Sequence, residues 1–327
     1  MSSVDQATGS WCIVTRPDLT LLDTRDMPWE PMPGIPGAMQ KVLSRDLDGD
    51  PRVQITWMPP GLRHDEPSRH YHRTVHERGF ALFGELPMRE YASVEDERGR
   101  PVLFRAGYYM DRLPGSVHGI DPDASSSVGF MMLDWRTGSG TYLREESAAQ
   151  ETALLPASRE IDDATPLHPE DAPAGTVVDS GKLRLLDTRA MAWEPMPGIR
   201  GARWKVLSRD DAGEAAVSII WMAPREPGGG HERHYHRTVH ERGFCLGGEL
   251  PMREFASVED DLGERVRFHE GVYMDRRPGS VHGVDATRGT ATGFTFLEWR
   301  SGPKTYLFED DVETETTILE AAPPPSA

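Results

Sequence analysis

The stretch HYHRTVHERGF occurs twice in this chain, at residues 70–80 and again at residues 234–244, and each copy is followed by PGSVHG, at residues 114–119 and 278–283. The chain has twelve histidines, and most of them lie in these blocks. The concentrated histidines are His70, His72, His76, His118, His234, His236, His240 and His282. Imidazoles gathered at one spacing in both copies indicate a metal site that is made twice.

The blocks belong to a longer internal duplication. An offset of 164 residues places Trp29 on Trp193 and His118 on His282 without a gap. Roughly three-fifths of the aligned positions between residues 21 and 143 are identical, which identifies a repeated structural unit. We therefore predict two domains, residues 13–157 and 177–321. The segment 158–176 between them is rich in proline, alanine and acidic residues and is predicted to be a linker.

Each copy consists of short β-like segments separated by glycine, proline and aspartate. Examples in the first copy are VQITWM at 53–58, GFALFGEL at 79–86 and PVLFRAGYYM at 101–110. Outside the linker, no stretch keeps a helical periodicity over about ten residues. The pattern predicts an all-β chain of two tandem jelly-roll β-barrels that arose by internal duplication.

Composition narrows the range of partners. The net charge of −17 and the isoelectric point near 5.1 argue against nucleic acid and anionic membranes, which need clustered lysine and arginine. Cys12 and Cys245 do not correspond between the repeats, which excludes a thiolate zinc site and disfavours a disulfide framework. The first residues lack a signal-peptide pattern, and no apolar run is long enough for a membrane span. We expect a cytoplasmic protein.

The spacing within the repeated blocks predicts the ligands. Residues two apart on a β-strand point to the same face, so His70 and His72 can enter one barrel together. Glu77 opens the next apolar strand, and His118 follows a Pro-Gly turn after which another strand would return. The predicted metal ligands are therefore His70, His72, Glu77 and His118 in the first domain and His234, His236, Glu241 and His282 in the second. No catalytic residue beyond these ligands is predicted.

The ligand types favour certain metals. Three imidazoles and one carboxylate suit a divalent first-row metal such as Fe(II), Mn(II) or Ni(II), which can take further ligands from water, oxygen or substrate. Zn(II) stays open but is less favoured, because four protein ligands would complete its tetrahedral shell. We expect one metal per domain, with Fe(II) the first choice.

With these motifs the chain resembles a bicupin, a two-domain member of the cupin superfamily. Its first motif needs a glycine, HxH, a glutamate and a glycine, and the second copy has Gly228, His234, His236, Glu241 and Gly248. The first copy matches from His70 to Gly84, but His64 takes the place of the leading glycine. The second motif is matched by Gly107, Gly115 and His118 and by Gly271, Gly279 and His282. Here the prolines at 114 and 278 lie one place late and the final asparagine is absent.

The resemblance implies a metal-dependent protein with a small-molecule substrate. Residues 27–46 and 191–210 are further similar to single-cupin oxygenases that cleave diketones or hydroxyacetophenones. We expect an Fe(II)-dependent dioxygenase, an oxidoreductase that chelates a small enolisable carbonyl or phenolic substrate and uses O2. A Mn-dependent decarboxylase or lyase acting on a small carboxylate is the first alternative. A metal-containing binding or sensor protein without turnover is the second.

Several features remain open at the level of sequence. His76 and His240 directly precede the glutamates, so they would face away from them on a strand, as structural residues or as alternative ligands. The segments before HxH, GLRHDEPSR at 61–69 and REPGGGHER at 225–233, differ strongly, which predicts different substrate access in the two halves. The sequence does not decide whether the chain forms a homodimer.

Overall fold

Strands make up the regular structure of this chain. The computed structural model describes residues 10–46, 49, 51–62, 69–137, 152–155, 174–197, 199, 201–225, 233–285, 287–301 and 316–319, and these residues contain no helix. Accordingly, the described part of the chain has no helix that is long and apolar enough to cross a membrane. Most of the predicted linker 158–176 and the loop residues 63–68 and 226–232 lie outside the described residues.

The strands of the first repeat begin near the N-terminus. They are β1 (Cys12–Arg16), β2 (Leu19–Asp23), β3 (Glu30–Pro31), β4 (Met39–Arg45), β5 (Pro51–Met58), β6 (His70–His72), β7 (His76–Tyr91), β8 (Arg100–Arg105), β9 (Tyr108–Arg112), β10 (Val117–Ile120), β11 (Phe130–Thr137) and β12 (Thr152–Leu154).

The second repeat forms the same series of strands. They are β13 (Thr176–Asp179), β14 (Leu183–Asp187), β15 (Glu194–Pro195), β16 (Ala202–Arg209), β17 (Ala215–Met222), β18 (His234–His236), β19 (His240–Phe255), β20 (Glu264–His269), β21 (Val272–Arg276), β22 (Val281–Val284), β23 (Phe294–Ser301) and β24 (Thr316–Ile318). The prediction of an all-β chain with two similar β-domains is confirmed.

Each repeat contributes to a separate 12-stranded antiparallel sheet that curls into a barrel. One sheet runs β12-β6-β10-β7-β11-β5-β4-β3, and the other runs β1-β2-β21-β19-β23-β17-β16-β15, with the remaining strands attached at their sides. The long strands β7 and β19 hold each barrel together, because their first halves pair with β9 and β11 or β21 and β23, and their second halves with β8 and β10 or β20 and β22.

A glycine makes the bend of β7 possible. Gly84 has a φ of 73°, and a Cβ built there would lie 1.9 Å from the carbonyl oxygen of Gly129. Gly248 in β19 has the same φ, and its Cβ would lie 2.0 Å from the oxygen of Gly293. Only glycine fits such a position. The bend carries both halves of the strand around the same barrel interior.

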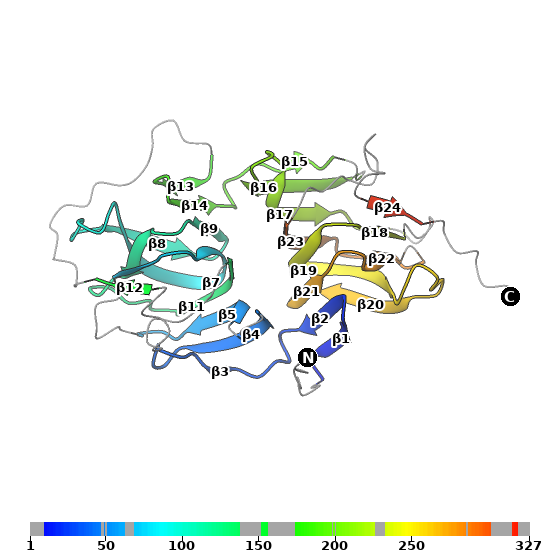
Figure 1. The fold of residues 1–327 in the computed structure, drawn as a ribbon, viewed down its shortest axis with the longest axis horizontal. Coiled ribbons are helices and arrows are strands. Elements are labelled where there is room, and N and C mark those ends of the chain that lie inside the picture. Colours follow the sequence, from blue (N-terminus) through cyan, green and yellow to red (C-terminus); the bar gives the residue numbers. More distant parts are fainter. Residues whose placement is uncertain are drawn as a thin grey trace. The chain divides into compact units, whose positions relative to one another are not determined.

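The two compact units do not coincide with the two sequence repeats. One unit consists of Pro28–Ala192, and the other of Met1–Met27 with Trp193–Ala327. The division arises because β2 pairs with β21 of the second repeat, while β14 pairs with β9 of the first repeat, as Figure 1 shows. The predicted boundaries 13–157 and 177–321 thus describe the duplication, whereas the folded units exchange their N-terminal arms, β1–β2 and β13–β14.

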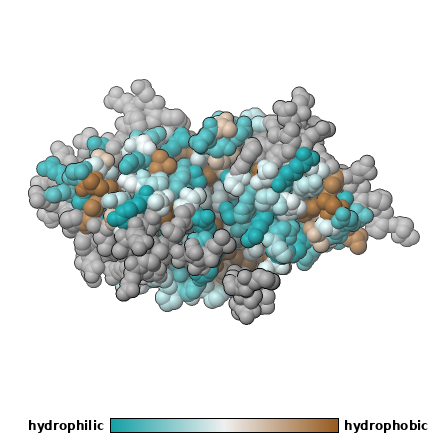
Figure 2. Space-filling model, viewed as in Figure 1, coloured by the Kyte–Doolittle hydropathy of each residue, from teal (hydrophilic) through white to brown (hydrophobic). Residues whose placement is uncertain are grey.

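The cores show the same exchange of arms. Val178, Leu183 and Leu185 pack with Phe104 and Phe130 of the first repeat. Val14, Leu19 and Leu21 pack with Phe268 and Phe294 of the second. On the face drawn in Figure 2, hydrophobic residues form small separate patches among hydrophilic ones, which agrees with apolar side chains turned inward.

Candidate metal centres

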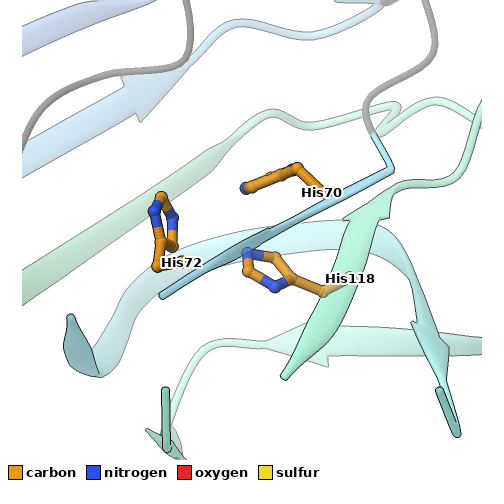
Figure 3. Close-up of side chains that lie close together, drawn as sticks. All are labelled: His70, His72 and His118. Carbon is orange, nitrogen blue, oxygen red and sulfur yellow. The ribbon is translucent and has the colours of Figure 1, made fainter. Parts of the chain in front are cut away.

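Strand pairing brings the three histidines of the first repeat together. His70 on β6 lies directly opposite His118 on β10, and His72 lies two residues further along β6 on the same face. The ring centroids of His70 and His118 are 4.2 Å apart, and that of His72 is 5.2 Å from His70. One nitrogen from each ring falls within 4.8 Å of the others, and Figure 3 shows the three rings converging.

The far ring nitrogens of two histidines each have a hydrogen-bond partner. His118 Nδ1 lies 3.0 Å from the backbone oxygen of Ser116, and His72 Nδ1 lies 3.0 Å from Thr152 Oγ1 on β12. A carbonyl oxygen can only accept, so Nδ1 of His118 carries the proton and Nε2 is left as a lone-pair donor. The Nε2 atoms of both rings face the shared centre.

Glu77 lies beside this centre, flanked by two arginines on the neighbouring strands. Its carboxylate oxygens are 3.3 Å from His72 Nε2 and 3.6 Å from His118 Nε2. The strand register places Arg112 of β9 on one side of Glu77 and Arg136 of β11 on the other. Arg112 Nη1 approaches Glu77 to 3.6 Å and Arg136 Nε to 3.8 Å. The carboxylate is therefore fixed in orientation toward the imidazoles.

The second repeat builds the same centre almost atom for atom. His234 and His282 have ring centroids 4.2 Å apart, and the nitrogens of His234, His236 and His282 again lie within 4.8 Å of one another. Glu241 oxygens are 3.4 Å from His236 Nε2 and 3.7 Å from His282 Nε2, and Arg276 Nη1 is 3.4 Å from Glu241. Duplication has preserved the geometry along with the sequence.

The charge states of the buried groups suit a cation. Burial, together with the positive charge of Arg112, holds the pKa of His118 well below its usual range, and burial with Arg276 does the same for His282. Burial opposes ionisation of Glu77, but the neighbouring His72 outweighs it and the pKa of Glu77 lies well below its usual range. A neutral imidazole at His118 or His282 offers a lone pair to a divalent metal, and an ionised Glu77 offers a negative charge beside it.

These observations fit a divalent metal in each barrel. His70, His72 and His118 would hold it in the first barrel and His234, His236 and His282 in the second, since their donor atoms already converge. Glu77 and Glu241 lie next to two histidines of each group, and their role as fourth ligands remains a prediction. The donor set admits Fe(II), Mn(II), Ni(II) or Zn(II).

A further pair of buried charges lies next to each metal centre. Arg112 binds Glu90 through Nη2 while its other amino group faces Glu77, and Arg276 joins Glu254 and Glu241 in the same way. Burial raises the pKa of Glu90 to about 7, although Arg112 opposes this effect. The sequence did not identify Glu90 or Glu254 as partners of these arginines. Their partner lies 22 residues away on another strand.

Each centre opens onto a pocket with largely apolar walls. The first pocket, including its open mouth, encloses about 880 Å³, and the second about 950 Å³. Five methionines line the first one, namely Met32, Met58, Met88, Met110 and Met132. Its polar lining includes Thr56, Arg112, Asp134 and Arg136 in addition to the predicted ligands. Sequence reasoning missed Asp134 and Arg136, whose alternation with Trp135 on β11 is the signal that they face inward.

His76 and His240 lie outside the metal groups. His76 Nε2 pairs with Asp111, which also faces Arg78 and the hydroxyl of Tyr109, and His240 pairs with Asp275 in the same way. The strand register puts Arg78 opposite Asp111 and Glu77 opposite Arg112, so the two sets occupy opposite faces of β7. The structure thus supports the structural alternative for these two histidines. His64, His231, Glu66, Glu226 and Glu232 lie outside the described residues.

The chain is similar to known proteins in its fold, whereas its sequence has no match. The sequence matches no protein-family model and no curated protein. Among solved structures, an oxalate decarboxylase from Lactobacillus farciminis has a TM-score of 0.53 at 13% identity, covering 94% of this chain and 90% of its own. A candidate dioxygenase from Nostoc punctiforme has a TM-score of 0.53 at 15% identity, covering 94% and 87%. The protein Ylba from E. coli has a TM-score of 0.51 at 11% identity, covering 90% and 96%.

The chain therefore has the bicupin fold, and the resemblance noted from its motifs is confirmed. Two three-histidine groups, one in each barrel, occupy the places that the motifs predicted. At these low identities the likeness shows the fold and leaves the reaction to be argued from the pockets themselves.

Proposed function

We propose that this bicupin is a non-heme Fe(II)-dependent dioxygenase that cleaves a small enolisable carbonyl or phenolic substrate. The observation that carries the proposal is the combination, in each barrel, of a three-histidine group and a glutamate with a deep pocket of apolar walls. A polar chelating centre beneath apolar walls suits a molecule with two neighbouring oxygens on one side and a hydrocarbon body on the other.

The walls favour this substrate class over a small dicarboxylate. The methionines and Phe104, Phe130 and Leu86 form the apolar part of the lining of the first pocket. Methionine side chains are flexible and polarizable, so they can close around an irregular apolar body. A molecule such as oxalate has no apolar part to bury there.

Residues around each centre would hold the metal, orient its ligands and exclude water. A bound Fe(II) would supply a Lewis-acidic, redox-active centre for the substrate oxygens and O2. His72 and His118 would hold it with Nε2 atoms that Thr152 and Ser116 orient from behind. Arg112 would keep Glu77 in place, and the apolar walls would exclude water from the bound substrate.

Oxygen consumption tests the proposal. The protein is loaded anaerobically with Fe(II), and O2 uptake is followed with a panel of β-diketones, hydroxyacetophenones and catechols. We expect uptake with at least one class, matched by cleavage products. The double variant His72→Ala and His236→Ala should abolish it, whereas Arg288→Gln, an exposed arginine outside both pocket linings, should not. If Fe(II)-loaded protein takes up no O2 with any compound of the panel, the dioxygenase proposal is wrong.

A second candidate is a Mn-dependent decarboxylase or lyase. Such a reaction needs a proton donor at the pocket, and Asp134 lies there. Burial raises the pKa of Asp134 to about 6, although Arg136 and Gln54 oppose this effect. Part of its carboxyl groups would then be protonated near neutral pH. Release of CO2 from oxalate or a β-keto acid by Mn-loaded protein, without net O2 uptake, would favour this candidate.

A further inference from the structure

The two pockets differ at one charged position on their rims. Arg225 is exposed and lines the second pocket, whereas the buried ligands His236 and His282 lie at its inner part. The repeat offset places Gly61 at the same position in the first copy, and Gly61 does not line the first pocket. The second pocket thus has a guanidinium at its open end where the first has no side chain.

The backbone of Arg225 is fixed at this rim. Its N–H donates to the oxygen of Thr290 over 3.2 Å, and the N–H of Thr290 donates back to the oxygen of Arg225 over 2.8 Å. Thr290 is buried, so it provides a firm anchor. Within the described residues, no ion pair ties the Arg225 guanidinium to a carboxylate. A guanidinium group can bind a carboxylate through two parallel hydrogen bonds.

The walls below Arg225 carry fewer polar groups than those of the first pocket. Ile220 replaces Thr56, and Phe296 replaces Met132. Arg136 lines the first pocket, whereas Arg300 does not line the second, where it is bound by Glu298 at 3.0 Å. Besides the arginine next to the glutamate of each centre, the first pocket is thus lined by Arg136 and the second by Arg225.

We propose that the second pocket takes a substrate whose hydrocarbon body ends in a carboxylate, and that Arg225 binds this carboxylate while the other end of the substrate faces the histidines. The first pocket, with Gly61 at the rim, takes the uncharged counterpart. The two centres of one chain then act on different members of one substrate class. This inference rests on the proposed function, because it assumes that an enolisable carbonyl occupies the metal centre.

Binding of a matched pair of probes tests the inference. The probes are 4,6-dioxoheptanoate, a β-diketone with a terminal carboxylate, and its methyl ester. The full chain is loaded with redox-inactive Zn(II), and binding is measured by titration calorimetry. The variant His72→Ala leaves only the second centre, and His236→Ala leaves only the first.

We expect the second centre to bind the carboxylate about five- to tenfold more tightly than the ester, as for a partly exposed charge-assisted hydrogen bond. Arg225→Gln should remove this preference, Arg225→Lys should retain part of it, and Arg288→Gln should leave it unchanged. The preference should also weaken as the salt concentration rises. The first centre should show no preference for the carboxylate.

Equal affinity of the second centre for both probes would overturn the inference, and so would failure of the carboxylate to bind there. A preference that survives in Arg225→Gln would also contradict it. The proposed function fails in a different way, since the probes would then bind to Fe(II)-loaded protein without O2 uptake. Calorimetry with Zn(II) and the oxygen measurement with Fe(II) keep the two outcomes apart.

Discussion

At Glu77, a single buried carboxylate is surrounded by two imidazoles and two guanidinium groups. Three of these neighbours have a further anchor, because Arg112 also binds Glu90, and the Nδ1 atoms of His72 and His118 contact Thr152 and Ser116. Unpaired charges are costly in such an interior. The site therefore depends on residues that touch the ligands as well as on the ligands themselves.

Thr152 provides a test of this dependence. Replacing it by valine removes the hydroxyl next to His72 Nδ1, so the ring loses the contact that orients it. We expect Thr152→Val to weaken metal binding at the first centre about 10- to 100-fold. Competition with a metal chelator, measured in the His236→Ala background, reports the first centre alone.

The control for this prediction is Thr152→Ser, which keeps the hydroxyl and should bind metal like the parent protein. Unchanged metal affinity in Thr152→Val would mean that strand packing alone orients His72.

Asp260 gives a pH-dependent prediction outside the metal centres. Its carboxylate accepts hydrogen bonds from the backbone N–H groups of Ala256, Gly263 and Leu262, which hold its pKa below the usual value of 3.8. A lowered pKa in the folded state stabilises the protein above pH 3.8, and this contribution is lost as the pH falls through the folded-state pKa. We expect Asp260→Asn to reduce the free energy of unfolding by about 0.5–1 kcal/mol at pH 7, because the carboxylate is only partly buried and solvent screens its charge.

Urea unfolding of metal-free protein between pH 3 and pH 7 measures this effect. The difference between Asp260→Asn and the parent should be constant from neutral pH to about pH 5 and should shrink below about pH 4. A difference that is the same at pH 3 and pH 7 would contradict the role of the charge.

At the level of the element, the bend in β7 is the feature that sets both halves of one strand around the same interior. Gly84 has a φ of 73° and leaves no room for a Cβ against Gly129. The motif glycine could be recognised in the sequence, but the reason for it lies in the close approach of a second loop. We expect Gly84→Ala to destabilise the first barrel by about 3 kcal/mol or more, from the unfavourable φ and the backbone clash together.

Gly213→Ala is the matched control for Gly84→Ala. Gly213 has a φ of 84°, and a Cβ there would meet nothing within 4 Å. This variant carries only the cost of the backbone conformation, about 1 kcal/mol. Comparing the thermal unfolding of the two variants separates the cost of the steric clash with Gly129 from the cost of the positive φ. Equal losses of stability would show that the contact with Gly129 relaxes freely.

At the level of the whole molecule, each N-terminal arm completes the barrel of the other repeat. Leu21 and Leu185 occupy equivalent positions in the two arms, and both are fully buried. Leu21 packs in the core of the second repeat, and Leu185 packs in the core of the first. Each arm therefore belongs to one repeat by its position in the sequence and to the barrel of the other repeat by its packing.

The exchange of arms predicts that a substitution in the arm of one repeat destabilises the barrel of the other repeat. Leu21→Ala should destabilise the barrel that holds His234, His236 and His282, and Leu185→Ala the barrel that holds His70, His72 and His118, each by about 2–4 kcal/mol. Hydrogen exchange should become faster in β19 and β23 for the first variant and in β7 and β11 for the second. The reverse pattern would show that each arm packs with its own repeat.

The sequence alone determined the all-β class, the duplication and the three-histidine groups, because spacing along one or two strands controls which side chains share a face. It did not determine the arm exchange. The arms read LTLLDTR and LRLLDTR, and their partner strands β9 and β21 read YYMDR and VYMDR, so local sequence gives no preference for either pairing. Only the tertiary structure decided which arm completes which barrel, which buried charges surround Glu77, and that Arg225 lines a pocket where Gly61 does not. These features depend on contacts between residues far apart in the chain, which no local pattern encodes.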